Sequence, residues 1–145
     1  MNAGNIVIRS ATTKDMEYVI RLLSTYFLHI DGVAIEDFMV ADINGRTVGC
    51  AALTYRPYPE LHTIAIHKNY RGRKIGSLLV ESIVGNMPEE WDNLYVRTTS
   101  PGFFEKAGFM KIPDPEKRDI WEDCASCERF ATCKQSAMRL PLKGT

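Results

Sequence analysis

The chain has 145 residues, of which 45% are hydrophobic and 25% are charged, a balance typical of one folded globular domain. Its 18 basic and 18 acidic residues cancel, which argues against a broad surface for binding nucleic acid or an acidic membrane. The apolar runs are too short to cross a bilayer, and the N-terminus lacks the apolar region of a signal peptide, so we expect a cytoplasmic protein.

The first elements predicted along the chain are a strand and a helix. Residues 5–9 are apolar and β-branched, as in a short strand, and Thr12 or Thr13 then supplies the N-cap of a helix. The helix is expected to end near residue 28, because apolar residues recur at helical spacing up to that point. This spacing predicts one buried stripe, formed by Met16, Val19, Ile20, Leu23, Tyr26 and Phe27.

A β-hairpin is predicted next. After a loop or single helical turn at 29–37, two apolar runs at 38–43 and 47–53 flank Asn44-Gly45. An Asn-Gly pair between two apolar runs is the strongest local signal for a hairpin turn. Cys50 lies in the middle of the second run, where we expect it to pack as a small buried hydrophobe.

The second half of the chain alternates between predicted strands and helices. In chain order these are a strand at 61–66, a helix at 75–84, a strand at 94–98, a short helix at 103–107, and strands at 109–112 and 137–140. Strands interleaved with helices in this way predict an α/β domain with a mixed sheet.

A basic, glycine-containing loop joins the strand at 61–66 to the helix that follows. Gly72 and Gly76 let the backbone approach a ligand closely, and the loop adds three cationic side chains, those of Arg71, Arg73 and Lys74. The helix start itself carries unpaired N–H groups and the positive end of a dipole, so it attracts anions. The order of strand, basic loop and helix therefore predicts a site for a ligand with several phosphates. The glycine spacing fits neither a Walker loop nor a dinucleotide fingerprint.

The loop does resemble the acetyl-CoA loop of the GNAT N-acetyltransferases, whose pattern is Q/R-x-x-G-x-G/A. Lys74 stands where that pattern has its first glycine, and the matching positions are Arg71, Gly72, Ile75 and Gly76. A second landmark, Phe-Phe-Glu-Lys-Ala-Gly-Phe at 103–109, is similar to the family's F-Y-E-K-x-G-F helix. Together with the strand, the capped helix and the hairpin, which come in the same order, the resemblance covers residues 6–112.

The resemblance implies a single GNAT-like domain over residues 1–145, with a mixed, mostly antiparallel twisted sheet of about seven strands flanked by helices. The chain looks most like the short N-acetylglutamate-synthase-like members, which share a tail like Trp121-Glu122-Asp123-Cys124-x-x-Cys127. It is shorter than those relatives between residues 28 and 38, where the acceptor would be contacted, so glutamate itself is not implied.

The resemblance further implies an N-acetyltransferase that moves the acetyl group of acetyl-CoA to the amine of a small acceptor, with an amino acid as one candidate. Backbone groups of Ile64, Ala65 and Ile66 would bind the pantetheine and the thioester oxygen. The N–H groups of residues 71–77, ending at Ser77, would hold the pyrophosphate. Phe104 would contact CoA where the family usually has a tyrosine acid, but Phe cannot donate a proton. This replacement suggests the alternative of a non-catalytic acetyl-CoA-binding or sensing module.

Three side chains are candidates for proton transfer. Glu60 matches the glutamate proposed as base in the synthase relatives, and we rank it first because a strand-end carboxylate can reach solvent through a water and attracts an ammonium. His62, two residues further along the same side of the strand, is the alternative base. Ser100 lies near the position of a serine acid in those relatives, and a helix N-cap is its alternative role.

The remaining candidates are three cysteines in a charged segment at 113–136, namely Cys124, Cys127 and Cys133. Their spacing is C-x2-C-x5-C, with no nearby histidine, which supplies only part of the ligand set of a typical zinc site. We therefore favour three reduced thiols, and keep a metal site as the alternative. Four cysteines without a secretory signal fit a reducing cytoplasm. The expected partners are acetyl-CoA and a small amine, with no nucleic acid and no membrane, and a homodimer stays open.

Overall fold

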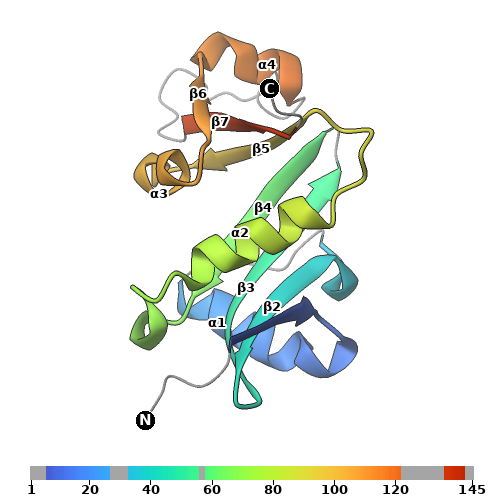
Figure 1. Ribbon diagram of the computed structural model, residues 1–145, viewed down its shortest axis with the longest axis vertical. Coiled ribbons are helices and arrows are strands. Elements are labelled where there is room, and N and C mark those ends of the chain that lie inside the picture. Colours follow the sequence, from blue (N-terminus) through green and yellow to red (C-terminus); the bar gives the residue numbers. More distant parts are fainter. Residues whose placement is uncertain (1–5, 27–32, 56–57, 122–135, 143–145) are drawn as a thin grey trace. The chain divides into compact units, whose positions relative to one another are not determined.

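The structure is a computed structural model that describes residues 6–26, 33–55, 58–121 and 136–142 (Figure 1). The described strands are β1 (Ile6–Ser10), β2 (Phe38–Ile43), β3 (Arg46–Tyr55), β4 (Pro59–Ile66), β5 (Asn93–Thr98), β6 (Met110–Ile112) and β7 (Ser136–Pro141). The described α-helices are α1 (Met16–Thr25), α2 (Ile75–Gly85), α3 (Pro101–Lys106) and α4 (Lys117–Ile120). Short 3-10 turns lie at Thr13–Asp15, Ile35–Asp37, Lys68–Tyr70 and Asp114–Glu116.

The strands form one seven-stranded sheet in the order β1-β2-β3-β4-β5-β7-β6. The pairs β1–β2, β2–β3, β5–β7 and β6–β7 are antiparallel, whereas β4 and β5 are parallel, with Glu60 opposite Tyr95. The predicted mixed, mostly antiparallel sheet is therefore confirmed. No helix in the described part of the chain is both long enough and apolar enough to cross a lipid bilayer.

The predicted elements differ from the structure mainly at their ends. α1 ends at Thr25, short of the predicted residue 28, and Tyr26 is its C-cap. β4 begins at Pro59, earlier than predicted, so that Glu60 lies inside the strand. α4 and the turn before it were not predicted, because the charged, proline-containing sequence there has no apolar periodicity.

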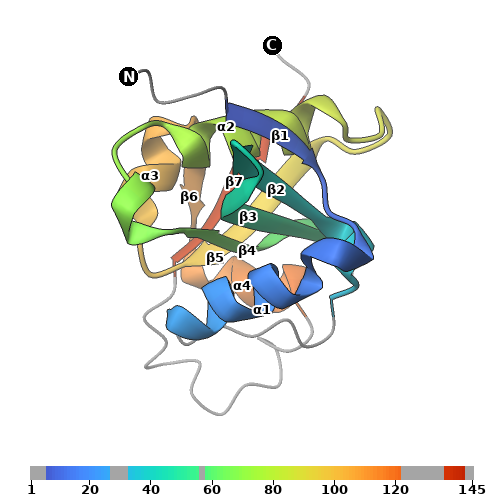
Figure 2. The ribbon, with the colours of Figure 1, turned by 90° about the horizontal axis from the view of Figure 1, so that it is seen from below.

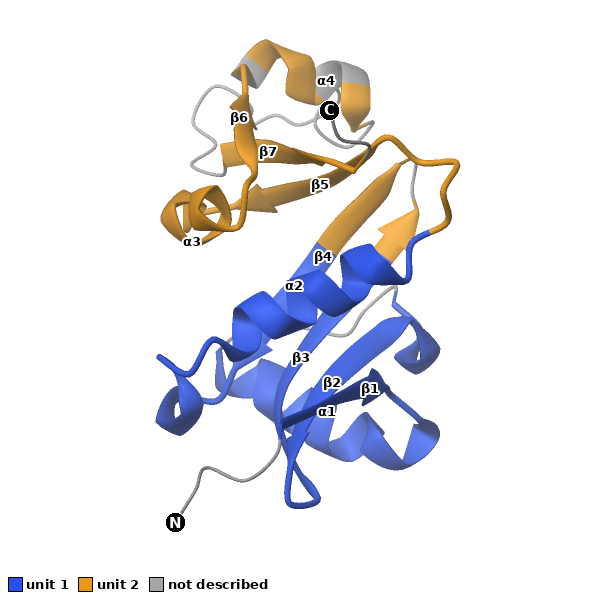
Figure 3. Cartoon of the chain, in the orientation of Figure 1, with its two compact units in different colours: residues 1–53, 62–87 blue, residues 54–61, 88–145 orange. Residues whose placement is uncertain are grey.

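The chain divides into two compact units, one made of residues 1–53 and 62–87 and the other of residues 54–61 and 88–145 (Figure 3). In the first unit, α1 and α2 lie on opposite faces of the strands β1 to β3 (Figure 2). The second unit contains β5, β6, β7, α3, α4 and the start of β4. One domain over residues 1–145 stays a prediction.

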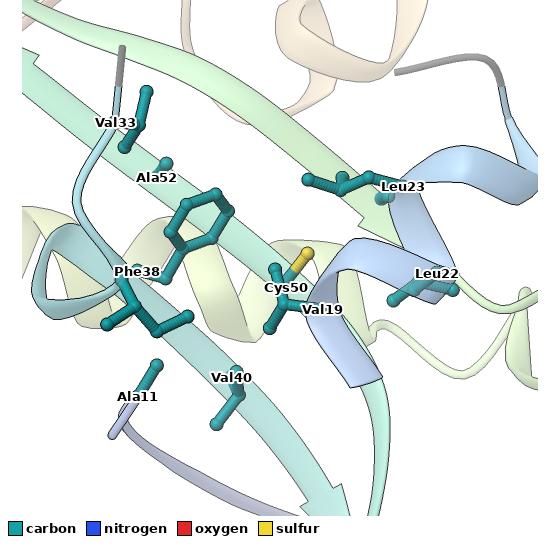
Figure 4. Close-up of a cluster of buried hydrophobic side chains, with 11 residues drawn as sticks. Ala11, Val19, Leu22, Leu23, Val33, Phe38, Val40, Cys50 and Ala52 are labelled. Carbon is teal, nitrogen blue, oxygen red and sulfur yellow. The ribbon is translucent and has the colours of Figure 1, made fainter. Parts of the chain in front are cut away.

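A hydrophobic core in the first unit packs α1 against β2 and β3 (Figure 4). The predicted stripe on α1 is partly wrong, because Met16 is 39% and Ile20 is 41% exposed, whereas Leu22 is buried. The helical repeat explains the difference, since position 22 falls on the same face as Val19 and Leu23, and Ile20 falls outside it. Phe27 lies outside the described residues.

Cys50 is a buried member of this core, as predicted (Figure 4). Burial without a compensating charge penalises the thiolate and raises the pKa of the Cys50 thiol to about 12. A thiol with this pKa has almost no thiolate at neutral pH, so Cys50 acts as a packing residue and not as a nucleophile.

The hairpin between β2 and β3 turns at Asn44 and Gly45, as the sequence predicts. Both residues have positive φ, 52° at Asn44 and 83° at Gly45. Two successive residues in the left-handed region form the turn whose twist matches that of paired strands, and Asn and Gly are the residues that adopt it most easily.

Asp15 anchors the start of α1 to the edge of the sheet. Its carboxylate accepts hydrogen bonds from both Nη groups of Arg9, at 2.8 Å and 2.9 Å, and from the backbone N–H of Thr12 at 2.8 Å. The Arg9 guanidinium is the main cause that holds the pKa of Asp15 at about 2, below its ordinary value. Thr12, one of the two predicted caps, is the N-cap of the 3-10 turn Thr13–Asp15, with Asp15 completing a capping box, while the N-cap of α1 itself is Asp15.

We expect this arrangement to make stability depend on pH in the acidic range. Because the folded-state pKa of Asp15 is depressed, its stabilisation is present above the ordinary pKa of about 4 and is lost as pH falls towards 2. Asp15→Asn should lower the free energy of unfolding at pH 7 by about 2 kcal/mol, and by much less at pH 2.5. Urea unfolding at both pH values measures this, and an equal loss at both would contradict it.

Candidate active site

The basic loop before α2 has a left-handed backbone at two positions. Gly72 has φ of 82° and Lys74, the N-cap of α2, has φ of 63° and ψ of 20°. Lysine rarely adopts this region because its Cβ crowds the following carbonyl oxygen. The loop therefore keeps a backbone turn at the position where the GNAT pattern has glycine, at the expense of local strain in Lys74.

This turn leaves the start of α2 open to a ligand. The Lys74 side chain makes no capping hydrogen bond, and its carbonyl accepts first from the N–H of Leu78 at 3.1 Å. The N–H groups of Ile75, Gly76 and Ser77 have no partner among the described residues, so they present three donors at the positive end of the helix dipole.

Two of the three loop cations lie beside tyrosines. The Arg71 guanidinium carbon lies 4.7 Å from the centroid of the Tyr26 ring, and that of Arg73 lies 5.1 Å from the Tyr70 ring. Arg71 Nε also donates a hydrogen bond to the carbonyl of Ile66 at 3.2 Å. Gly72, Arg73 and Lys74 are exposed. The loop thus offers an exposed group of positive charges next to unpaired N–H groups, which suits a polyphosphate.

The end of β4, from Ile64 to Ile66, runs towards this loop. Ala65 is buried, and Ile64 and Ile66 are half-buried. The neighbouring strand β3 approaches closely at Gly49, where an added Cβ would lie 2.8 Å from Ile66 Cδ1. The carbonyl of Ile66 is engaged by Arg71, so among the backbone groups predicted to bind pantetheine this one already has a protein donor.

Glu60 is buried, with 5% of its surface exposed, and it is the second residue of β4. Its Oε2 accepts from Arg97 Nε at 2.8 Å and its Oε1 from Arg97 Nη2 at 3.0 Å. Oε1 also accepts from the indole N–H of Trp121 at 3.1 Å. Three donors therefore occupy both oxygens of this carboxylate and hold it in place within the second unit.

Trp121 joins this ion pair in a network inside the second unit. The guanidinium carbon of Arg97 lies 4.7 Å from the Trp121 ring centroid, so the indole both donates to Glu60 and covers its partner. The Tyr95 ring packs edge-on against Trp121, with 5.8 Å between centroids. Arg97 and Trp121 were missed by sequence reasoning. The parallel register of β4 and β5, which no local signal reveals, brings Arg97 to Glu60, whereas Trp121 reaches it from the end of α4.

The other two candidates for proton transfer are exposed. His62 Nδ1 lies 2.7 Å from the hydroxyl of Thr63, and the His62 side chain is exposed to solvent. Ser100 occupies the N-cap position of α3, but its hydroxyl makes no capping hydrogen bond, and its N–H donates to Thr98 Oγ1 at 2.9 Å. The alternative role of Ser100 as a side-chain cap is therefore not seen.

Phe104 is buried at the centre of a small aromatic group in the second unit. Its ring packs edge-on against Phe103 and Phe109, with centroid distances of 4.9 Å and 5.3 Å. This packing accounts for the apolar residue at a position where the GNAT pattern has tyrosine. Cys124, Cys127 and Cys133 lie outside the described residues, and the residues that are described contain no group of metal ligands.

Comparisons with known proteins agree with the fold and with the family that the sequence resembles. The model of the acetyltransferase (GNAT) domain matches residues 34–111, which include the hairpin, β4, the basic loop and α3. An uncharacterized N-acetyltransferase from Chlorobaculum tepidum is 30% identical over 153 residues, covering 95% of this chain and 97% of that protein.

Two solved structures share the fold. N-acetylglutamate synthase from Neisseria gonorrhoeae, complexed with coenzyme A and N-acetyl-glutamate, has a TM-score of 0.80 and 20% identity, covering 99% of this chain but 36% of that one. A Mycobacterium tuberculosis protein in complex with CoA has a TM-score of 0.77 and 25% identity, covering 94% of this chain and 99% of that one. Family match, full-length relative and fold together show that the chain belongs to the GNAT family and is an acetyl-CoA-dependent N-acetyltransferase.

Proposed function

We propose that the acceptor is the amine of an amino acid or of a small amino-acid-like molecule. The support is the shared fold with N-acetylglutamate synthase, whose structure holds N-acetyl-glutamate. The test is to incubate the protein with acetyl-CoA and a panel of free amino acids, polyamines and short peptides, and to measure release of the CoA thiol and the mass of the product. Turnover confined to polyamines or peptides would contradict the acceptor class. Tight acetyl-CoA binding without any turnover would favour a sensing module.

The donor would be held by the loop and the end of β4. The N–H groups of Ile75, Gly76 and Ser77 are the donors proposed for the pyrophosphate, and Arg71, Arg73 and Lys74 would add charge-assisted contacts. The single observation that carries this proposal is the uncapped start of α2 behind two left-handed residues. Backbone groups of Ile64 and Ala65 would align the pantetheine and the thioester along β4.

The reaction proposed here forms one C–N bond and breaks one C–S bond. The neutral amine attacks the thioester carbonyl carbon, and the carbonyl electrons move to oxygen as the tetrahedral intermediate forms. The intermediate collapses with the electrons of the C–S bond leaving on sulfur as CoA thiolate. The nitrogen loses a proton and the thiolate gains one, so the enzyme must supply a base and an acid or a water for each.

The contacts of Glu60 lead us to propose His62 as the base, with Glu60 as the alternative. The Glu60 side chain is only 7% exposed, and both of its oxygens already accept hydrogen bonds from Arg97, so an incoming amine has little access to it. His62 is exposed and would present Nε2 to the amine when its Nδ1–H donates to Thr63. Ser100, whose hydroxyl is not used as a cap, is the residue proposed to protonate the thiolate, a role that Phe104 cannot fill.

Replacing parts of the loop should weaken donor binding. We expect Arg71→Ala to weaken CoA binding at least about tenfold, because a charge-assisted hydrogen bond to phosphate is lost. Gly76→Glu should weaken it more, since it places a carboxylate in the first turn of the helix that receives the pyrophosphate. Titration calorimetry with CoA measures both.

The matched control is Arg46→Ala, which removes an exposed cation at the start of β3, outside the loop. It should leave the affinity for CoA within about twofold, since a distant exposed charge is screened by salt. Unchanged affinity in both loop variants would remove the loop from the donor site.

The proposed setting is the cytoplasm, whose reducing environment suits a protein with four cysteines. Cys50, the cysteine that the structure describes, is a free thiol. Fractionation of cells that produce the tagged protein tests this location.

A further inference from the structure

Tyr26 links the end of α1 to the basic loop through two contacts of one side chain. Its hydroxyl accepts a hydrogen bond from the backbone N–H of Lys68 at 2.8 Å, across 42 positions of the chain. Its ring lies under the Arg71 guanidinium, 4.7 Å from the guanidinium carbon to the ring centroid. All three residues belong to the first compact unit. Tyr26 is half-buried against the core, and its hydroxyl and its ring can make the contacts with Lys68 and Arg71 at the same time.

The hydroxyl contact completes the hydrogen bonding of the turn that precedes Arg71. In the turn Lys68–Tyr70, the N–H of Asn69 donates to His67 Nδ1 at 3.2 Å and that of Tyr70 donates to the His67 carbonyl at 2.8 Å. The N–H of Lys68 is the remaining donor, and Tyr26 is its partner. His67 itself is tied to β3, because its N–H donates to the carbonyl of Val48 at 2.8 Å. One hydrogen bond therefore joins the residue before the turn to β3, and another joins the turn to Tyr26 at the end of α1.

The ring contact fixes the direction of the Arg71 side chain. Arginine carries five N–H donors, and here Nε is used on the Ile66 carbonyl while one face of the guanidinium lies against Tyr26. These two restraints hold an otherwise exposed and flexible side chain, so that the N–H groups of its two Nη atoms are presented together to an anion. A side chain that is already ordered loses less entropy when it binds phosphate.

We propose that Tyr26 is a positioning residue for donor binding, acting through Arg71 and through the turn Lys68–Tyr70. This inference rests on the proposed role of the loop in holding acetyl-CoA. Tyr26 itself touches neither donor nor acceptor in this scheme. Its contribution is to order the loop before the donor arrives, so its loss should appear in the affinity for the donor and not in the chemical step.

The test uses two substitutions that remove the two contacts in turn. Tyr26→Phe keeps the ring and loses the hydroxyl, and we expect it to weaken CoA binding about threefold. Tyr26→Leu keeps apolar packing on the core and loses both contacts, and we expect a loss of about tenfold. KM for acetyl-CoA should rise by similar factors, while kcat for the best acceptor stays within about twofold. A general loss of stability would instead lower kcat through the active fraction and leave KM unchanged.

Tyr18 provides a matched control on the same helix. It is exposed, and the Arg21 guanidinium carbon lies 5.9 Å from its ring centroid, so Tyr18→Leu also removes a tyrosine beneath an arginine. This variant should leave the affinity for CoA unchanged. A double-mutant cycle gives the sharper result. Tyr26→Leu and Arg71→Ala should be clearly less than additive in CoA affinity, because each removes the same ordered arginine, whereas Tyr18→Leu and Arg71→Ala should be additive.

The outcomes separate this inference from the proposed function. If the wild-type protein does not bind CoA, the proposed donor site fails. If the wild type binds CoA and Tyr26→Leu binds it equally well, or if its effect adds fully to that of Arg71→Ala, the positioning role is wrong and the donor site stands. Where Tyr26→Leu does not fold, Tyr26→Phe and Arg71→Lys decide the question, since the second keeps the charge and loses the planar contact with the ring.

Discussion

Replacing His62 with glutamine is expected to lower kcat about a hundredfold, the usual cost of removing a general base, while the affinity for CoA changes by less than about twofold. Glutamine keeps a polar side chain of similar size but cannot accept the proton from the amine. His62 is exposed on β4, two residues before the proposed thioester site, and Thr63 Oγ1 holds its Nδ1 at 2.7 Å. When that contact is donated by Nδ1–H, Nε2 is the free acceptor.

The measurement is the pH profile of kcat/KM with the best acceptor. The wild type should show a limb in which the rate rises with pH as its base loses a proton, and His62→Gln should lack that limb. Glu60→Gln is the matched variant on the same strand. If Glu60→Gln abolishes the limb in a folded protein and His62→Gln does not, the base is Glu60 and our assignment is wrong.

Replacing Arg97 with alanine is expected to lower the free energy of unfolding by about 3–5 kcal/mol, because the buried carboxylate of Glu60 loses its cationic partner. The two side chains are 18% and 7% exposed and are joined by two hydrogen bonds, so the remaining charge would have little water and one neutral donor, Trp121. Glu60→Gln should also be destabilising, since it replaces two charge-assisted hydrogen bonds from Arg97 with weaker contacts to a neutral amide. Both tryptophans lie in the second unit, so urea unfolding followed by intrinsic fluorescence reports on it.

Two controls separate burial from charge. Arg21→Ala breaks the pair with Glu17, whose side chains are 68% and 77% exposed, and should cost at most about 0.5 kcal/mol because that pair is screened by water. The double variant Glu60→Leu with Arg97→Met removes both charges and should regain much of the loss. A loss for Arg97→Ala as small as that for Arg21→Ala would show that the buried pair contributes no more than a surface pair.

The hairpin turn and the apolar repeat of α1 show which structural features can be predicted from the sequence. Asn44 and Gly45 were predicted as a turn because the backbone preference of each residue is intrinsic to it, and both have the positive φ that this preference allows. Ile20 was predicted as buried and is exposed, because apolar spacing identifies a face of α1 but not its edges. Which residues at the edge are covered depends on how the helix is placed over β2 and β3.

Taken by itself, the sequence determined the form of the basic loop that we propose for the donor, since its glycines, its cations and the helix start lie within a few consecutive residues and act through local backbone geometry. The tertiary structure alone decided the state of Glu60. Its partners are 37 and 61 positions away: Arg97 is brought to it by the pairing of β4 with β5, and Trp121 by the placement of the end of α4. The same holds for Tyr26, which meets Lys68 across 42 positions. Such contacts arise from the packing of distant segments, and no local pattern encodes that packing.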